Sequence, residues 1–360
     1  MFAPHTFAAA LVMTILSTIC WGSFANTFKL TKNFRFELYY WSYAVGIFAI
    51  SVILALTMGS ANHNDQSFLA NLHHAAPANL WYAAIGGFIF NIANVLLMAG
   101  IEIAGLAVAF PISIGIALVE GVVLSYALQP KGNAVLLGAG VAMAVVAIIL
   151  IGKAYGQLGG TGKAETKTAR VAAASALDST MRTSSGQDAG AVGARHKPNR
   201  KGVVVCVVSG LLMGAFAPFV TRAMTANRPL TPYTVAVLFT LAAFVCCFVF
   251  NTILMKRPIV GTPVSFADLV RAPGAYHLLG LLGGLIWGIG TVFNFVAASL
   301  VGVAISYAIG QASPMIAAVW GVFVWHEFRG SNTRAKGYLA GMFTAYALAL
   351  VLIAKAYQAP

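Results

Sequence analysis

Ten long apolar stretches make up most of this chain and leave it few ways to fold. Each has about 20 residues, the length that an α-helix needs to cross a hydrocarbon core of about 30 Å. Only 9% of the 360 residues are charged, against about a quarter in soluble domains. Strands of a transmembrane barrel would be about 10 residues long with alternating polarity, so the sequence predicts an all-α membrane protein. The predicted spans are residues 7–29, 37–58, 80–101, 105–127, 134–155, 202–224, 232–255, 276–298, 301–325 and 336–356.

The second half of the chain repeats the first. The first half ends in Lys153-Ala154-Tyr155 and the second in Lys355-Ala356-Tyr357, and residues 86–126 align with residues 283–323 at a constant offset of 197 (283 minus 86). Each half holds five spans, an odd number, so the second half must enter the membrane from the opposite side. We therefore expect ten transmembrane helices arranged as an inverted 5+5 repeat. The expected domains are a first repeat (1–155), a linker (156–201) and a second repeat (202–360).

Basic residues concentrate on one side of the membrane. The net charge of +13 raises the question of nucleic-acid binding, but that function needs a basic face on a folded polar domain. Here the Lys and Arg residues lie between the spans, so we expect no nucleic-acid partner. If the loops alternate sides, 18 of the 22 Lys and Arg lie on the side of the linker, and the other four are Lys131, Arg222, Arg228 and Lys355. The positive-inside rule makes that side cytoplasmic, and we expect a plasma (inner) membrane protein with both termini outside.

The linker is rich in Gly, Ala, Ser, Thr and basic residues and cannot form a core, so we expect a flexible, basic, cytoplasmic segment. Its stretch Gly159-Gly160-Thr161-Gly162-Lys163-Ala164 is similar to a phosphate-binding loop. Gln157 and Ala164, however, stand where that motif needs a Gly and a Ser or Thr. The four cysteines lack metal-ligand spacing. We therefore expect no bound cofactor and no metal site.

Glu120 lies well inside the fourth span, where its repeat equivalent is the apolar Ala317. A charge at the bilayer centre costs at least about 2.5–3.5 kcal/mol on insertion scales, so such a residue is interpreted as functional by default. Ser113 and Ala117 share its helical face and predict a channel-like surface of small residues. Burial without a basic partner favours the neutral carboxyl, so we expect Glu120 to carry a coupling proton. The alternative is that Glu120 hydrogen-bonds a neighbouring helix and holds the bundle together.

Amide and aromatic side chains mark one face of the third and one face of the eighth span. Asn91 and Asn94 share the first of these faces, and Trp287, Thr291 and Asn294 share the second. Because Asn94 and Thr291 are repeat equivalents, we expect both faces to line one central cavity. Aromatic walls with carboxamides suit a small neutral solute that is planar or polyhydroxylated.

Two other spans contribute to the expected cavity. Tyr307 and Gln311 precede Pro314 on the ninth span, where we expect a broken helix with a carbonyl facing the cavity. The predicted substrate-binding residues are Trp21, Asn26, Asn91, Asn94, Trp287, Thr291, Asn294, Tyr307 and Gln311. We assign Trp41, Trp81 and Trp325 to the membrane edge, where tryptophan is usually an anchor.

Short motifs occur in order along the chain. They are Cys20-Trp21-Gly22, Gly105-Leu106-Ala107-Val108, Gly162-Lys163-Ala164-Glu165, Gly283-Gly284-Leu285-Ile286-Trp287-Gly288, Ala312-Ser313-Pro314-Met315, Trp320-Gly321 and Glu327-Phe328-Arg329. In these motifs the chain resembles the ureide permease family of the drug/metabolite transporter superfamily. The resemblance implies proton-coupled import of allantoin-like ureides and nucleobases such as uracil.

Two alternatives to this function remain at the level of the sequence. Sugar permeases of the superfamily, including the rhamnose–proton type, share the architecture and leave a sugar–proton symporter open. A drug or metabolite exporter is a further alternative, against which Asn91, Asn94 and Asn294 weigh. We do not expect an enzyme, because no Ser-His or metal-ligand constellation lies within the spans.

Overall fold

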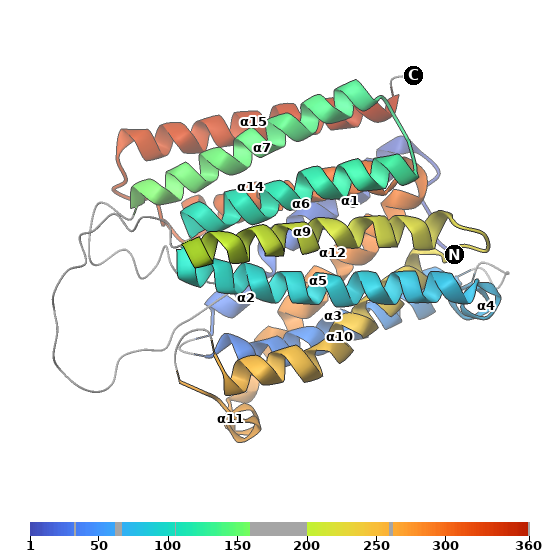
Figure 1. Ribbon diagram of the computed structural model, residues 1–360, viewed down its shortest axis with the longest axis horizontal. Helices are drawn as coiled ribbons and strands as arrows, with labels where there is room; N and C mark the ends of the chain where they lie inside the picture. The colour runs from blue at the N-terminus through green and yellow to red at the C-terminus, as the bar shows by residue number, and fades with distance from the viewer. Residues whose placement is uncertain (32–33, 62–66, 105, 159–199, 259–261, 359–360) are drawn as a thin grey trace.

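The computed structural model of the chain describes residues 1–31, 34–61, 67–104, 106–158, 200–258 and 262–358, and these residues form helices and turns but no strand. Ten helical stretches among them are long and apolar enough to cross a membrane. The predicted all-α class with ten spans is therefore confirmed (Figure 1). Most of the predicted linker, residues 159–199, lies outside the described residues.

The helices follow the hydropathy of the sequence closely. The first half contains α1 (Phe7–Ser23), α2 (Ala25–Lys29), α3 (Phe36–Leu56), η1 (Met58–Ser60), α4 (Phe68–His74), α5 (Pro77–Ala104), α6 (Leu106–Leu128) and α7 (Ala134–Leu158). The second half contains α9 (Arg200–Thr225), α10 (Pro232–Lys256), α11 (Phe266–Arg271), α12 (Gly274–Val301), α13 (Val303–Gly310), α14 (Ser313–Val319), η2 (Trp320–Val324) and α15 (Thr333–Gln358). Each predicted span coincides with one of these helices, or with consecutive ones, to within a few residues.

The helices of each half pack mainly on helices of the other half. Helix α1 contacts α12, α13 and α14, whereas α9, the first helix of the second half, contacts α5 and α6. Helix α3 packs on α12 as α10 packs on α5, and α7 lies beside α15 (Figure 1). These pairs exchange when the halves are exchanged, which is consistent with the expected repeat. The space between the halves therefore lies along the middle of the bundle.

The two ends of the bundle differ in charge. Helices α2 and α7 stop at one end of the bundle, and α9 begins there. This end carries Lys29, Arg200 and Lys256, and we call it the basic end (Figure 1). At the other, the terminal end, the rings of Phe7 and Tyr357 stack at a centroid distance of 5.0 Å. Both ends of the chain thus lie on the same side of the bundle, as an even number of spans requires.

The small-residue face around Glu120 is a helix contact, not a channel surface. The Ser113 hydroxyl donates to the Cys206 carbonyl of α9 at 2.9 Å. A Cβ atom added to Gly214 of α9 would lie 2.8 Å from the Cβ atom of Glu120, and one added to Gly210 would lie 2.8 Å from the Ser113 carbonyl oxygen. Small residues spaced in this way let two backbones approach closely. The channel-like interpretation was wrong because a pore wall and a close helix contact favour the same small residues.

Candidate solute cavity

A cavity of about 210 Å³ lies between the two halves. Nearly half of the residues that line it are aromatic, and none of the described lining residues is charged. The aromatic lining residues are Trp21, Phe24, Phe36, Tyr39, Tyr40, Tyr43, Phe90, Tyr155, Phe216, Phe239, Trp287, Phe295 and Tyr307. The site is therefore a neutral, ring-lined chamber inside the membrane.

Repeat-equivalent residues meet in this chamber. The rings of Phe90 and Trp287, equivalent at the offset of 197, are 5.1 Å apart at an angle of 30°. Asn94 and its equivalent Thr291 both line the cavity. The expectation that the two faces share one cavity is confirmed, because side chains from both spans line it.

Seven of the nine predicted substrate-binding residues line the cavity: Trp21, Asn94, Trp287, Thr291, Asn294, Tyr307 and Gln311. Asn26 and Asn91 do not. Asn26 accepts a hydrogen bond from the indole of Trp325 at 2.6 Å and donates to the Ser23 carbonyl at 2.8 Å. Asn91 lies behind Tyr40, whose hydroxyl donates to the Asn91 Oδ1 atom at 2.7 Å. Both carboxamides hold neighbouring side chains instead of facing the chamber.

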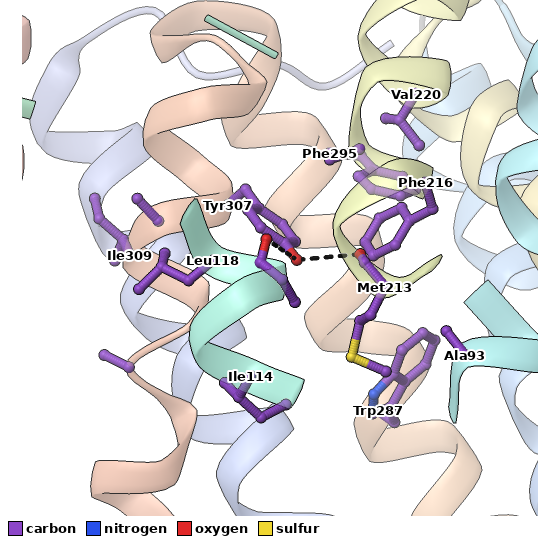
Figure 2. Close-up of a cluster of buried hydrophobic side chains, with 14 of the residues drawn as sticks. Ala93, Ile114, Leu118, Met213, Phe216, Val220, Trp287, Phe295, Tyr307 and Ile309 are labelled. Carbon is purple, nitrogen blue, oxygen red and sulfur yellow. Dashed lines mark hydrogen bonds between the residues drawn. The ribbon is translucent and has the colours of Figure 1, made fainter. Parts of the chain in front are cut away.

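The hydroxyl groups of two lining residues form hydrogen bonds with other groups of the protein. The Thr291 hydroxyl accepts from the Trp21 Nε1 atom at 3.2 Å and donates to the Trp287 carbonyl at 3.1 Å. The Tyr307 hydroxyl reaches the carbonyl of Met213 at 3.3 Å, as Figure 2 shows, and that of Ala117 at 3.4 Å. These hydroxyls fix the geometry of the wall and have little capacity left for a solute.

Other polar atoms of the wall are available. Asn294 donates through Nδ2 to the Ser306 carbonyl at 2.9 Å, which leaves its Oδ1 atom without a partner among the described residues. Within the same part of the chain, Gln311, the Trp287 indole N–H and the Tyr43 hydroxyl also make no side-chain hydrogen bond. The chamber thus offers neutral donors and acceptors to a guest. The sequence did not single out Tyr43, although the spacing of Phe36, Tyr39, Tyr40 and Tyr43 places these rings on one helical face.

The ninth span is broken where the sequence predicts. Helix α13 ends at Gly310, Gln311 and Ala312 form a turn, and α14 begins at Ser313 with Pro314 in its first turn. The break lets Gln311 turn its carboxamide into the chamber. The Ile309 carbonyl at this break is not free to face the cavity, because it accepts from the Ala312 N–H at 3.0 Å and from the Thr18 hydroxyl of α1 at 3.1 Å.

Glu120 lies close to the cavity but does not line it. It packs against Gly214, and its Oε2 atom is buried with no hydrogen-bond partner in the described residues. Tyr307 enters between α6 and α9 beside it, since a Cβ atom on Gly121 would lie 2.6 Å from the Tyr307 ring (Figure 2). A tyrosine that lines the chamber therefore separates Glu120 from it.

Two acids that the sequence analysis did not consider as site residues are more buried than Glu120. Glu37 forms a bidentate ion pair with Arg35, at 3.1 Å and 2.7 Å. Glu327 forms an ion pair with Lys29 at 2.6 Å. Each carboxylate lies at a membrane edge, where a hydropathy window treats charge as solvated, so only the three-dimensional structure reveals the pairing.

The expected anchor role holds for one of three tryptophans. Trp81 is 69% exposed, as an anchor should be. Trp41 is only 8% exposed, and its indole N–H donates to the Met255 sulfur at 3.1 Å. Trp325 bonds to Asn26. The anchor assignment was wrong for Trp41, because a buried indole N–H needs a partner inside the protein. Trp325 is only partly buried, so its anchor role stays a prediction.

A second hollow opens at the terminal end. Its volume is about 420 Å³, and its lining includes Met1, His74, Gln129, Arg228 and Ser299. It shares no described lining residue with the central cavity. The bundle thus has separate spaces at its centre and at its terminal end.

Comparisons with known proteins agree with this architecture. A family model described as ureide permease matches residues 188–356. Ureide permease 1 of Arabidopsis thaliana is 22% identical over 98% of this chain and 98% of its own length. Ureide permease 5 of the same plant is 24% identical, with 96% and 93% covered. The chain is thus similar to the ureide permeases, through the family model in its second half and through the plant relatives over nearly its whole length. It is therefore a multi-pass membrane transporter and not an enzyme, as the sequence predicts.

Two further matches are partial or distant. Residues of this chain are 35% identical over 74 positions to the probable glucose uptake protein GlcU of Staphylococcus aureus, which is 21% of this chain and 25% of that protein. A solved crystal structure with 14% sequence identity superposes with a TM-score of 0.57 and covers 97% of this chain and 98% of its own. That structure shares the fold.

Proposed function

We propose that the protein imports a small, neutral, planar solute of the ureide or nucleobase class, coupled to protons, by alternating access. The observation that carries this proposal is the central cavity, with its aromatic wall and its unpaired neutral polar atoms. An ionic solute entering this chamber would lose its hydration without meeting an opposite charge among the described lining residues, which is costly. A neutral solute avoids that cost.

The available atoms match the edge of a cyclic amide or a urea. Such a group presents an N–H beside a C=O. The Asn294 Oδ1 atom can accept from that N–H, the Trp287 indole can donate to that C=O, and the Gln311 carboxamide can do both. The cavity of about 210 Å³ is smaller than the ~300–1,000 Å³ of drug-sized sites, which favours a solute with one small ring. The names of the plant relatives support the same class.

The path of the solute follows from the two halves. The hollow at the terminal end and the basic end lie on opposite sides of the central cavity, so rocking of one half against the other would expose the cavity to each side in turn. The Lys and Arg count supports a cytoplasmic position for the basic end. The proposed direction of import is therefore from the terminal end to the basic end.

Glu120 is the proposed proton site. Its buried Oε2 atom has no hydrogen-bond partner among the described residues. Tyr307 packs against Gly121, next to Glu120, and also lines the solute chamber. A proton bound there would favour one of the two access states, which is the differential affinity that coupling needs. Tyr307 provides a direct steric connection between the solute and Glu120.

A sugar–proton symporter is the second candidate. The match to the probable glucose uptake protein favours it, and sugars also pack on aromatic rings. Planarity distinguishes the two solute classes, because a planar ring stacks on Trp287 over its whole face whereas a pyranose does not.

Uptake into proteoliposomes tests the proposal. Purified protein is reconstituted with an inward proton gradient and offered labelled allantoin, uracil, glucose or rhamnose. We expect allantoin or uracil to accumulate above the level in empty liposomes, and accumulation of a sugar alone would establish the second candidate. Glu120→Gln should abolish uphill uptake but keep counterflow exchange, with Glu37→Gln as the matched control. Normal uphill uptake in Glu120→Gln would remove Glu120 from coupling.

A further inference from the structure

A buried ion pair connects the two halves at the basic end. The Lys29 Nζ atom is 2.6 Å from the Glu327 Oε1 atom, and the two side chains are only 5% and 0% exposed. Lys29 ends α2 in the first half, and Glu327 follows η2 in the second. The same ammonium group lies 4.2 Å above the ring of Trp325. One cation therefore binds two groups of the opposite half.

Two hydrogen bonds reinforce this connection. The Trp325 indole donates to Asn26 at 2.6 Å, and the Trp320 indole donates to the Ser23 hydroxyl at 2.8 Å. Both bonds join the segment of α1 and α2 to the segment of η2. We call these two bonds, together with the Lys29–Glu327 pair, the basic-end clasp.

The clasp is built on an unusual backbone. Residues Trp320–Val324 form a π-helix. This conformation is rare in proteins, and where it does occur it is often at a functional site. His326, directly before Glu327, has a φ of +52°, which costs a residue with a Cβ atom some strain. The η2 segment is thus held by its partners in a conformation that it would not prefer alone.

The clasp closes one end of the solute cavity. Gly22 and Ala25 of the first segment line the cavity, as does Ala317 of α14, the helix that leads into η2. Tyr155 also lines the cavity, and its ring packs on Phe328 at 5.3 Å. A solute leaving the chamber toward the basic end must pass between these two segments.

We propose that the basic-end clasp is the inner gate of the transporter and that the Lys29–Glu327 ion pair is its latch. This inference rests on the proposed alternating-access function. The pair suits a two-state element, because separating the charges into water restores the hydration that burial removes. The Glu327 Oε2 atom has no described hydrogen-bond partner, so the closed state does not saturate this carboxylate. Among the described residues, the titratable groups that face Glu327 are Lys29 and Tyr155.

Cysteine accessibility tests the gate. In a variant without the four native cysteines, Ala317→Cys places one thiol on the cavity wall, and a charged, membrane-impermeant methanethiosulfonate is added on the side of the basic end. The thiolate forms a mixed disulfide with the reagent and methanesulfinate leaves. We expect Glu327→Gln and Lys29→Gln to raise the rate of this modification about tenfold, a ratio that corresponds to about 1.4 kcal/mol. The exchanged pair Lys29→Glu with Glu327→Lys should return the rate toward that of the parent.

Glu37→Gln is the matched control, because it also breaks a buried ion pair at the basic end but one whose residues both lie in the first half. An unchanged rate in Glu327→Gln, or an equal rise in Glu37→Gln, would overturn the proposal. If the charge variants do not fold, Asn26→Ala removes one hydrogen bond of the clasp without leaving a buried charge unpaired. An unchanged modification rate in that variant would also overturn the proposal. The reagent reports only whether the cavity is open toward the basic end. If the protein did not bind allantoin or uracil, the proposed solute would be wrong but this test of the gate would still be valid.

Discussion

Some polar groups of the cavity wall are free to bind a solute, and others already bond to the protein. This difference predicts opposite effects for two substitutions that barely change the volume of the side chain. Gln311→Leu removes a carboxamide that bonds to no described protein group, so the loss falls on the solute. A net hydrogen bond contributes about 0.5–1.5 kcal/mol, which is about 2- to 13-fold in Kd. Thr291→Val removes the acceptor of the Trp21 indole, and an orphaned donor costs about 1–3 kcal/mol of unfolding free energy.

Two measurements on the same purified proteins separate the effects. Binding of labelled uracil or allantoin reports Kd, and a thermal unfolding curve without solute reports stability. We expect Gln311→Leu to weaken binding with little change in Tm, and Thr291→Val to lower Tm with a smaller change in Kd. The reverse pattern, with Gln311→Leu unfolding early and Thr291→Val losing the solute, would show that the assignment of available groups is wrong.

Three further predictions concern packing, the gate and recognition. Gly284→Ala should lower stability by about 1–3 kcal/mol, because its Cβ atom would meet the Tyr43 carbonyl and approach Gly46 to 2.9 Å; Gly138→Ala, with nothing within 4 Å, is the control, and equal melting curves would contradict the close contact. Burial raises the pKa of the Glu327 carboxyl, although the Lys29 hydrogen bond and charge act against this. Neutral Glu327 cannot pair with Lys29, so disulfide formation at Ala317→Cys from the basic end should become faster, relative to the rate in Glu327→Gln at the same pH, as pH falls toward that raised pKa. The comparison at equal pH removes the loss of cysteine thiolate that affects both proteins. Trp287→Leu should weaken a planar solute by about 1–3 kcal/mol, the range for stacking of a base on an aromatic ring, and equal uracil affinity in a direct binding assay would exclude stacking on Trp287.

The spans and the shared cavity could be predicted because both depend on local or repeated features of the sequence. Hydropathy over about 20 residues defines a span without knowledge of its neighbours. The offset of 197 pairs Asn94 with Thr291, and two-fold packing then brings them to the same chamber. Pro314 predicts the break in the ninth span because proline removes a backbone donor. Each of these inferences needs only one helix or one symmetry relation.

The partners of individual polar groups could not be predicted. Asn26 pairs with Trp325 across 299 positions, and Lys29 pairs with Glu327 across 298. No period in the sequence marks such contacts, and each residue alone has an ordinary explanation as a cap, an anchor or a solvated charge. Glu120 attracted attention because it stands inside an apolar span, whereas a carboxylate at a span edge can be equally buried once another helix covers it.

Residues that the two halves share and residues in which they differ therefore have different roles in transport. Equivalent residues such as Phe90 and Trp287 build a chamber at the centre, and two-fold symmetry alone would make both ends of it alike. Alternating access needs ends that can close independently, and a coupled carrier needs ends whose closure responds differently to the proton. Lys29 has the equivalent Thr221 when the first spans are aligned through Gly22 and Gly214 (214 minus 22 is 192), so the equivalent position at the terminal end is uncharged. In the proposed mechanism the ion pair therefore gives the two mouths different chemistry, and a transporter with a direction requires such a difference.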